Sequence, residues 1–282
     1  MIPNPTPRRI FLKQSAAAAL ATLATSHLTA QTPNSRPLFD GLTLKGWTPK
    51  PRGNKSTSLG SWKVVDGVLI GGQYPVGAGC YLVSDEAFTN FELQLDARPD
   101  WPADTGIYLR AAADGHAGIQ VNLDYRPHGS IGGYFGNGLG SFHAYSYGFT
   151  ADKHPDGSIA RLIPGPPSQP NDTGHLVTPD FMAPAETLLK VWKLNDWNTL
   201  RMRSIGDVPT ITTWINNVRI SELNTAKLVA DGWSTDNFLK TCGHAGHIGL
   251  EVHNNAPGDW LGNDRWAPGA VCRWRNITIK TL

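Results

Sequence analysis

The order of apolar and polar residues predicts short β-strands over most of the chain. Apolar and polar residues alternate in many short segments, and a period of two residues is typical of a strand with one buried face. These segments are residues 61–72, 91–98, 105–111, 118–125, 197–205, 211–221, 247–254 and 272–282. Only residues 184–193 have the spacing of a short helix. Strands without alternating helices predict an all-β fold, an antiparallel β-sandwich or jelly roll.

Turn residues add detail to this picture. Asp66-Gly67 and Asn216-Asn217 each separate two strand-like runs, and these residue types tolerate the positive φ that two-residue hairpins need. Residues 149–184 break the pattern with a stretch rich in proline and polar residues, "LIPGPPSQPNDTG" at its centre. A loop of this length is typical of a lid or a binding loop. We therefore expect a long Pro-rich insert at the rim of one face.

The first 31 residues are typical of an export signal. Arg8 and Arg9 precede a short Ala-rich apolar run and a small-residue exit near Ala30, which indicates a cleavable twin-arginine signal peptide. The apolar run is shorter than the roughly 20 residues that span a bilayer. We predict a signal peptide over 1–31, a single domain over 36–282, and a periplasmic or extracellular protein with no membrane span after cleavage.

Composition excludes some functions. The net charge of +2 and the lack of a basic run argue against nucleic-acid binding. The chain has three cysteines, Cys80, Cys242 and Cys272, whose spacing is not that of a metal site. Three cysteines can form at most one disulfide, and free buried thiols are the alternative. Several of the ten tryptophans, Trp260 among them, fall in loop-like stretches. There they can stack on sugars or pack at a sandwich edge.

The polar faces of three predicted strands share an unusual composition. In "HIGLEVHNN" (247–255), Ile248, Leu250 and Val252 alternate with a face that includes Glu251 and His253. If this strand shares a sheet with 105–111 and 118–125, one face collects Tyr108, Arg110, Gln120, Asn122, Asp124, Glu251 and His253. Amide, guanidinium and imidazole groups make directional hydrogen bonds that suit a saccharide or carboxylate pocket. The alternative is the ordinary solvent face of an antiparallel sheet.

Motifs of familiar enzymes are missing. Four histidines, His116, His128, His143 and His154, fall in or beside Gly-rich stretches, where they could form a pocket wall, a base or metal ligands. However, the sequence has no His-rich metal motif, no G-x-S-x-G and no P-loop. Glu92 and Asp96 resemble the carboxylates of a sandwich glycosidase only superficially, because their spacing differs from E-x-D-x-x-E.

Several segments together resemble a known family. "LFDGLTLKGW", "WKVVDGVLIG", "TGIYLR", "DWNTLRMR", "WINNVRI", "IGLEVHN" and "RWRNITIK" occur in the order found in the 3-keto-disaccharide hydrolase family. The resemblance covers nearly all of the chain after the signal peptide except 149–190. It implies a concanavalin-like jelly roll. Two positions depart from the family pattern, Glu251 where Gln is common and Asn217 where Gly is common.

The family's chemistry is an elimination on an oxidised sugar. A glycoside 3-oxidoreductase first converts the C3 hydroxyl to a ketone, after which a modest base can remove the C2 proton if the enolate oxygen is stabilised. The C1 substituent then leaves, and water adds to give the 3-keto sugar. The resemblance therefore implies a 3-keto-glycoside hydrolase or lyase, and it leaves room for a divalent metal ion beside the base.

The resemblance also implies roles for the residues of the polar face. His253 is the base or a metal ligand, Glu251 tunes or orients it, and Arg110 polarises the ketone or holds a hydroxyl. His116 and His143 are the alternates for a second proton transfer. The substrate-binding candidates are Tyr108, Gln120, Asn122, Asp124 and Trp260. Two other functions stay open, a non-catalytic lectin-like sandwich and, less favoured, a retaining glycosidase.

Overall fold

A computed structural model describes residues 34–53, 56–124, 129–145, 148–156, 158–165, 176–255 and 265–282. Residues 33–282 form one compact unit. The predicted signal peptide lies outside the described residues. None of the helices in the described ranges has the length and apolar content that crossing a bilayer requires.

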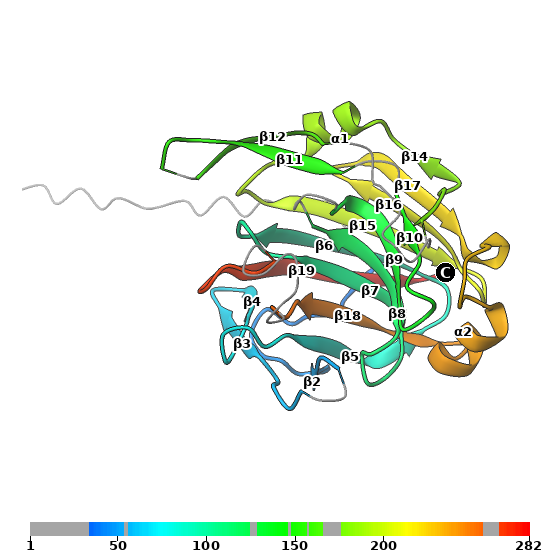
Figure 1. The fold of residues 1–282 in the computed structure, drawn as a ribbon. Coiled ribbons are helices and arrows are strands. Elements are labelled where there is room, and N and C mark those ends of the chain that lie inside the picture. The colour runs from blue at the N-terminus through cyan, green and yellow to red at the C-terminus, as the bar shows by residue number, and fades with distance from the viewer. Residues whose placement is uncertain are drawn as a thin grey trace, which may run out of the picture. The chain divides into compact units, whose positions relative to one another are not determined.

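Two large sheets form the fold (Figure 1). Sheet A has nine strands, with β1 (Arg36–Pro37) beside β19. Its other strands lie in the order β14 (Phe181–Met182), β17 (Val218–Asn224), β16 (Thr210–Ile215), β15 (Asn198–Ile205), β6 (Phe91–Pro99), β19 (Val271–Thr281), β4 (Val68–Gly72) and β3 (Ser61–Val65). Sheet B has eight strands, in the order β13 (Leu176–Val177), β10 (His143–Ala144), β9 (Ile131–Asn137), β8 (Gly118–Leu123), β7 (Thr105–Ala111), β18 (Gly246–Val252), β5 (Cys80–Phe88) and β2 (Trp47–Pro51).

The core lies between the inner faces of the two sheets. Leu93 and Leu95 of β6 and Ile107 and Leu109 of β7 belong to one continuous cluster and are fully buried. Burying a side chain of this kind contributes about 1.5–3 kcal/mol. Apart from the β10–β13 pair, the described pairings in both sheets are antiparallel. The predicted antiparallel β-sandwich is therefore confirmed.

The local predictions are largely confirmed. Both residues of each predicted hairpin turn have positive φ, at 50° and 78° for Asp66-Gly67 and at 48° and 67° for Asn216-Asn217. Helix α1 (Ala185–Val191) falls within the predicted helical segment. Helix α2 (Thr235–Cys242) was not predicted, although Ser234 caps its first turn through the Asn237 amide (3.1 Å) and Gly243 ends it at φ 72°.

The Pro-rich insert contains more structure than a loop. β11 (Phe149–Lys153) and β12 (Ile159–Pro164) pair as a separate two-stranded sheet. β13 and β14 then join sheets B and A. Residues 166–175, which include most of the proline run, lie outside the described residues.

A β-bulge interrupts the alternation of β7. Ala111 pairs with His247 and Tyr108 with Gly249, so that two residues, Leu109 and Arg110, oppose one. Arg110 has φ 54°, the left-handed conformation at which such a bulge changes the direction of the chain. Side chains before and after this point therefore do not follow one period of two.

The three cysteines are free and buried. Burial raises the pKa of the Cys80 and Cys242 thiols to about 12 and shifts the pKa of Cys272 in the same direction. Of the two sequence alternatives, the structure has the free thiols.

Candidate functional site

The outer face of sheet B carries a set of polar side chains from four adjacent strands. Tyr108 of β7 pairs with Gln120 of β8, and Glu251 of β18 pairs with Tyr81 of β5. Residues that pair directly in neighbouring strands point to the same face. Gly106 leaves room between them, because a Cβ atom there would lie 2.3 Å from Gln120 Nε2.

Glu251 is the anchor of this face. Its side chain is fully buried, and Oε1 accepts hydrogen bonds from Arg52 Nε (2.9 Å) and from the Tyr108 hydroxyl (3.3 Å). Oε2 accepts one from Gln120 Nε2 (2.5 Å). Charge-assisted bonds of this kind fix the geometry of a buried carboxylate.

Burial and Glu251 together shift the pKa values of its neighbours. Burial, followed by the charge of Glu251, raises the pKa of Tyr108 well above its ordinary value, so Tyr108 remains a neutral hydrogen-bond donor. Burial alone lowers the pKa of Arg52, but the attraction of Glu251 leads the opposing effects and the net pKa is raised. Arg52 is thus a permanent cation at the edge of this face.

His253, just beyond the end of β18, lies between two guanidinium groups. Arg52 Nη2 is 2.8 Å and Arg265 Nη1 is 2.6 Å from its Nε2 atom, and Nδ1 is 2.7 Å from the Asn254 carbonyl oxygen. Arginine can only donate hydrogen bonds, so Nε2 accepts from Arg52 and Nδ1 carries the proton that is donated to Asn254. Arg265 Nη1 is also 3.3 Å from Nδ1, so it contacts the side of the ring and does not lie along the Nε2 lone pair. The contacts thus assign a neutral imidazole with two cations beside Nε2.

An acidic group completes the cluster. Asp104 Oδ2 lies 3.7 Å from His253 Nε2 and 4.0 Å from Arg265 Nε. Arg52 also donates to the side-chain oxygen of Asn254. We call Arg52, Asp104, Glu251, His253 and Arg265 the Arg–His cluster.

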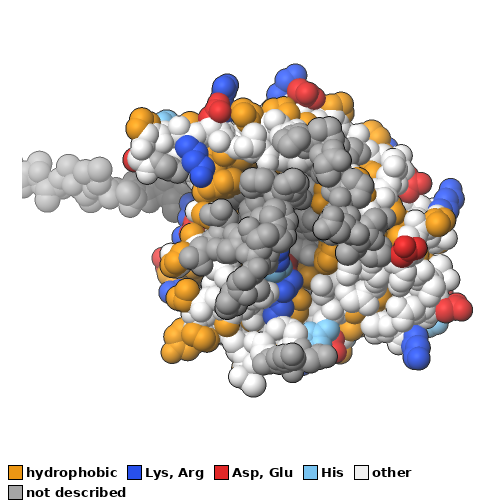
Figure 2. Space-filling view, viewed as in Figure 1, with side chains coloured by type: hydrophobic (Ala, Val, Ile, Leu, Met, Phe, Trp, Pro, Cys, Tyr) orange, Lys and Arg blue, Asp and Glu red, His pale blue; other side chains and the backbone are white. Residues whose placement is uncertain are grey.

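The two guanidinium groups are the most exposed part of the Arg–His cluster, since His253 and Asp104 are 9% and 8% exposed. The side chains of Arg52 and Arg265 are 19% and 18% exposed, whereas Glu251 is 0% exposed. In Figure 2, Lys or Arg atoms and His atoms come to the surface close together on the face that is shown. A ligand would therefore meet the guanidinium donors first.

The Arg–His cluster does not fit a divalent metal ion at His253. Two guanidinium nitrogens already lie 2.8 and 2.6 Å from Nε2 and Nδ1 donates to a carbonyl, and two neighbouring positive charges repel a third. Within the described ranges, no three His, Cys, Asp or Glu side chains lie close enough together to hold a metal.

The structure brings four of the predicted residues together, Tyr108, Gln120, Glu251 and His253. Glu251 reaches His253 through Arg52, which bonds to both. Glu251 can therefore orient His253 only indirectly, through Arg52, a residue that was not predicted from the sequence.

Four other predicted residues lie on or beside the same face. Asn122 pairs with Gly106 and is 3.4 Å from Ser130 Oγ, and the Asp124 amide donates to the Ser130 carbonyl oxygen. The His116 ring meets the Tyr81 ring edge-on at 6.4 Å. His143 lies two strands from Gln120, about 10 Å away, and its Nδ1 is 3.2 Å from the Tyr145 hydroxyl. Trp260 and His128 lie outside the described residues.

Arg110 is a correction to the sequence analysis. Its side chain is fully buried and donates to the carbonyl oxygens of Gly206, Asp207 and Gly243 (3.1, 3.2 and 2.8 Å) and, at 3.4 Å, of Thr89. Its guanidinium also lies 5.5 Å from the centre of the Phe238 ring. The bulge turns Arg110 away from the face of Tyr108, so it joins loops and helix α2 instead of polarising a ketone.

The sequence analysis missed most of the Arg–His cluster. Arg52, Asp104 and Arg265 lie outside the described strands, where an alternating pattern carries no information about the direction of a side chain. Asp104 directly precedes β7. An acidic residue next to a strand of the polar face was a sequence feature that could have pointed to it.

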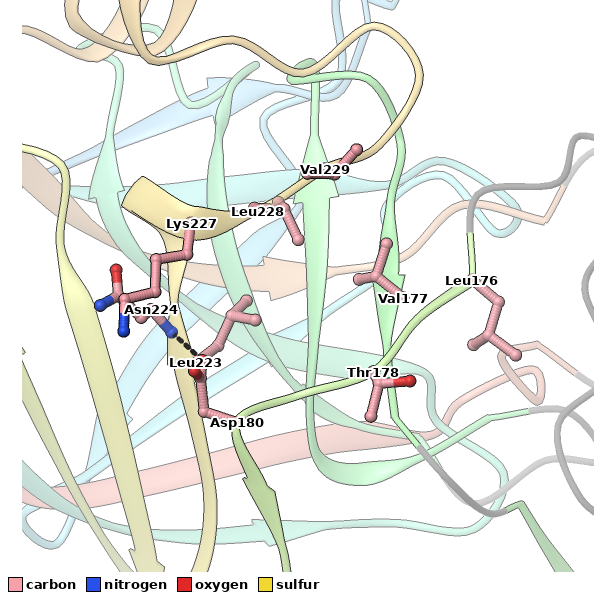
Figure 3. A pocket seen from close by; sticks show the side chains of 9 residues that line it. All are labelled: Leu176, Val177, Thr178, Asp180, Leu223, Asn224, Lys227, Leu228 and Val229. Carbon is pink, nitrogen blue, oxygen red and sulfur yellow. Dashed lines mark hydrogen bonds between the residues drawn. The ribbon is translucent and has the colours of Figure 1, made fainter.

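A separate pocket lies away from this face. It measures about 280 Å³ and is bordered by β13, by the end of β17 and by the segment after it (Figure 3). Asp180 on its wall accepts a hydrogen bond from the Asn224 amide (2.6 Å). The pocket is lined by none of the predicted site residues.

Comparisons with solved structures find remote likenesses. A candidate glycosyl hydrolase from Parabacteroides distasonis shares 14% identity at a TM-score of 0.48, covering 88% of this chain and 94% of that one. The carbohydrate-binding module CBM66 from Bacillus subtilis shares 12% identity at a TM-score of 0.44, covering 84% and 96%. A search of curated proteins finds no match.

A family model gives the assignment. The model of the 3-keto-alpha-glucoside-1,2-lyase-like domain matches residues 34–280, nearly the whole described chain. This match agrees with the resemblance seen in the strand motifs and supports a carbohydrate-related function. The chain belongs to the 3-keto-alpha-glucoside-1,2-lyase-like family.

Proposed function

We propose that the Arg–His cluster cleaves 3-keto-glycosides by removing the proton on C2 and expelling the substituent on C1. The observation that carries this proposal is the pair of guanidinium nitrogens, from Arg52 and Arg265, that lie 2.8 and 2.6 Å from the Nε2 atom of His253. Elimination beside a ketone needs a base and oxyanion donors next to each other, because the C2 proton and the C3 oxygen are on adjacent atoms.

The substrate ketone takes over the donors that now bind His253. When the C3 oxygen accepts hydrogen bonds from Arg52 and Arg265, Nε2 is released to take the C2 proton. The C2–H electron pair forms the C2=C3 bond of the enolate, and the charge on oxygen is stabilised by the two cations. As the ketone re-forms, the electrons make C1=C2 and the C1–O bond breaks. The leaving oxygen then gains a proton from the imidazolium or from water.

The carboxylates of the cluster balance these charges. Protonated His253 would be a third cation beside two arginines, and Asp104, 3.7 Å from Nε2, offsets part of the repulsion. Glu251 holds Arg52 through Nε, and the Nη2 group that now contacts His253 is the one that would bind the substrate. In this proposal Gln120, Tyr108 and Tyr81, which share one face of sheet B, bind the sugar hydroxyls.

The wider setting is part of the same proposal. The protein is exported through the twin-arginine route, and a glycoside 3-oxidoreductase supplies its keto substrate. Addition of water to C1 then completes hydrolysis.

The deciding experiment compares an aryl glucoside with its 3-keto derivative, with and without a chelator. Product from the keto substrate alone, unaffected by the chelator, would support the proposal. Binding of both sugars without product would instead favour a lectin-like sandwich that uses the same face. Turnover that the chelator abolishes would contradict the roles given to Arg52 and Arg265.

A further inference from the structure

The outer face of sheet A carries two groups in which one tryptophan ring is covered by two guanidinium groups. Arg201 lies 3.8 Å and Arg203 5.5 Å from the ring centre of Trp214. Arg275 lies 4.1 Å and Arg98 5.2 Å from the ring centre of Trp197. Stacking on an aromatic ring holds the planar guanidinium in one orientation. We call these four arginines the arginine array.

Two carboxylates of β6 lie beneath the array. Glu92 accepts from Arg201 Nη1 (3.0 Å) and from Arg203 Nη2 (2.7 Å), and Asp96 accepts from Arg275 Nε (3.3 Å). Glu92 and Asp96 are 7% and 5% exposed, whereas the three arginines are 25%, 45% and 34% exposed. A molecule that approaches this face therefore meets guanidinium groups and not carboxylates.

The positive charge of the array exceeds what the carboxylates neutralise. Arg98 pairs directly with Arg273 across β6 and β19, and Asp100 balances the Arg273 charge by accepting a hydrogen bond from its Nη1 (2.5 Å). The four arginines of the array thus lie over two carboxylates, Glu92 and Asp96. An anionic ligand would balance the remaining positive charge.

The charge is local, since the rest of the protein is not basic. Residues 1–31 contain three basic residues and no acidic ones, so a total of +2 leaves −1 for the remainder. Such a chain has little general attraction for polyanions. Binding would have to occur at the array.

We propose that the arginine array binds the carboxylate groups of an extended acidic polysaccharide. Glu92 and Asp96 are four residues apart on one strand, so the two groups lie about 13 Å from each other along a continuous strand. A polymer with repeated carboxylates can reach both, and a planar carboxylate matches the fork of a guanidinium. Single-stranded nucleic acid is less suited, because it needs free aromatic faces on which bases stack, and arginines cover these two rings.

The array is independent of the Arg–His cluster. The two sites lie on the outer faces of different sheets, with the apolar core between them. Binding at the array would hold the enzyme on an acidic polymer without taking part in turnover. Loss of polysaccharide binding would therefore leave the proposed cleavage reaction unaffected, and loss of cleavage would leave polysaccharide binding unaffected.

The test measures binding of polygalacturonate, with neutral dextran, single-stranded DNA and anionic vesicles as comparisons. We expect binding of polygalacturonate that weakens as salt is added, since the array is partly exposed to solvent. The double variant Arg201→Gln/Arg275→Gln should lose about tenfold or more in affinity. Its matched control, Arg36→Gln/Arg161→Gln, removes the same charge from exposed pairs elsewhere and should bind as the wild type does.

A second variant guards against loss of folding. Arg201→Lys/Arg275→Lys keeps both charges but loses the planar fork, and it should lose several-fold in affinity with an unchanged melting temperature. Three outcomes would overturn the proposal. The control variant loses as much affinity as the array variant, the array variants bind as tightly as the wild type, or DNA or vesicles bind more tightly than polygalacturonate.

Discussion

The two outer faces of the sandwich use similar residues in different ways. Each has a buried carboxylate beneath arginines, Glu251 on sheet B and Glu92 on sheet A. On sheet A the arginines come from regular strand positions and stack on aromatic rings. On sheet B they come from bends outside the strands, and both lie within hydrogen-bond distance of one imidazole.

The difference indicates what each face can do. Cations spread over a flat sheet face can contact a ligand, but they leave no reactive group among them. Cations that converge on a neutral histidine create a base next to oxyanion donors, which is the requirement for proton abstraction. The two faces differ because the arginines of sheet A lie mainly within strands, whereas those of the Arg–His cluster lie in segments between strands.

The strongest test of this comparison removes the histidine. His253→Ala deletes the base, and general-base catalysis contributes about 10²–10⁴-fold to rate. Turnover of a 3-keto-glucoside should fall by this amount, while polygalacturonate binding is unchanged. Arg201→Gln should do the opposite. If His253→Ala keeps a normal rate, the Arg–His cluster is not the active site.

Removing one oxyanion donor should have the next largest effect. Arg265→Ala takes away the guanidinium nitrogen 2.6 Å from His253 Nε2, and loss of such a donor costs about 10²–10³ in kcat. Single-turnover kinetics would show the loss in the chemical step. A rise in KM with kcat unchanged would mean that Arg265 only binds substrate.

A third test compares two buried arginines. Arg110→Ala leaves several carbonyl oxygens without their donor, and we expect a loss of about 3 kcal/mol in the free energy of unfolding. For a domain of this size the melting temperature should fall by about 6–12 °C. Arg52→Ala should mainly lower turnover, since Arg52 bonds to side chains of the cluster. Urea unfolding and initial rates of both variants check this. Loss of turnover without loss of stability in Arg110→Ala, or the opposite in Arg52→Ala, would contradict the assignment.

A smaller change tests how tightly the face of sheet B is packed. Gly106→Ala places a Cβ atom against Gln120 and should push its amide away from Glu251. One lost charge-assisted hydrogen bond corresponds to about a tenfold fall in turnover. The double variant Gly106→Ala/Gln120→Ala should be no worse than Gln120→Ala alone, because both changes break one contact. Additive losses would place the effect of Gly106 elsewhere.

Alkaline pH should lower the free energy of unfolding through the buried tyrosines. Burial raises the pKa of Tyr81, Tyr108 and Tyr134 above the ordinary value near 10. Each favours its neutral form in the folded state, so its contribution to stability is complete below pH 10. Above about pH 10 that contribution declines by about 1.4 kcal/mol per pH unit for each tyrosine.

Two conservative variants make this measurable. Tyr108→Phe and Tyr134→Phe should each reduce the slope of unfolding free energy against pH by that amount. Only Tyr108→Phe, which loses a hydroxyl bonded to Glu251, should also lower turnover at pH 7, since Tyr134 bonds to Ile211 in the core. Unchanged slopes would mean that these hydroxyls are accessible to solvent.

The sequence predicted what depends on local periodicity. Leu93, Ile107 and Leu250 alternate and are buried, and the Asn216-Asn217 turn has the expected backbone. β9 was not predicted, because four of the seven residues in "IGGYFGN" are glycine or asparagine and the segment has no period of two. Elements whose residues do not alternate need tertiary contacts to be recognised.

The site was harder to predict for two physical reasons. Alternation placed Tyr108, Gln120 and Glu251 on one face, but the bulge at Leu109 and Arg110 inverted the facing of Arg110. Arg52 and Arg265 are 213 positions apart in residue number and meet only at His253. Such a long-range contact leaves no local pattern in a single sequence.

The free cysteines have a practical consequence. Cys80 lies in sheet B, Cys272 in sheet A and Cys242 in helix α2, and all three are buried. Thiol reagents attack the exposed thiolate, so each cysteine reacts only when its own region opens. The natural protein thus contains three internal reporters. Their separate labelling rates would show whether the two sheets and the helix come apart together or one at a time.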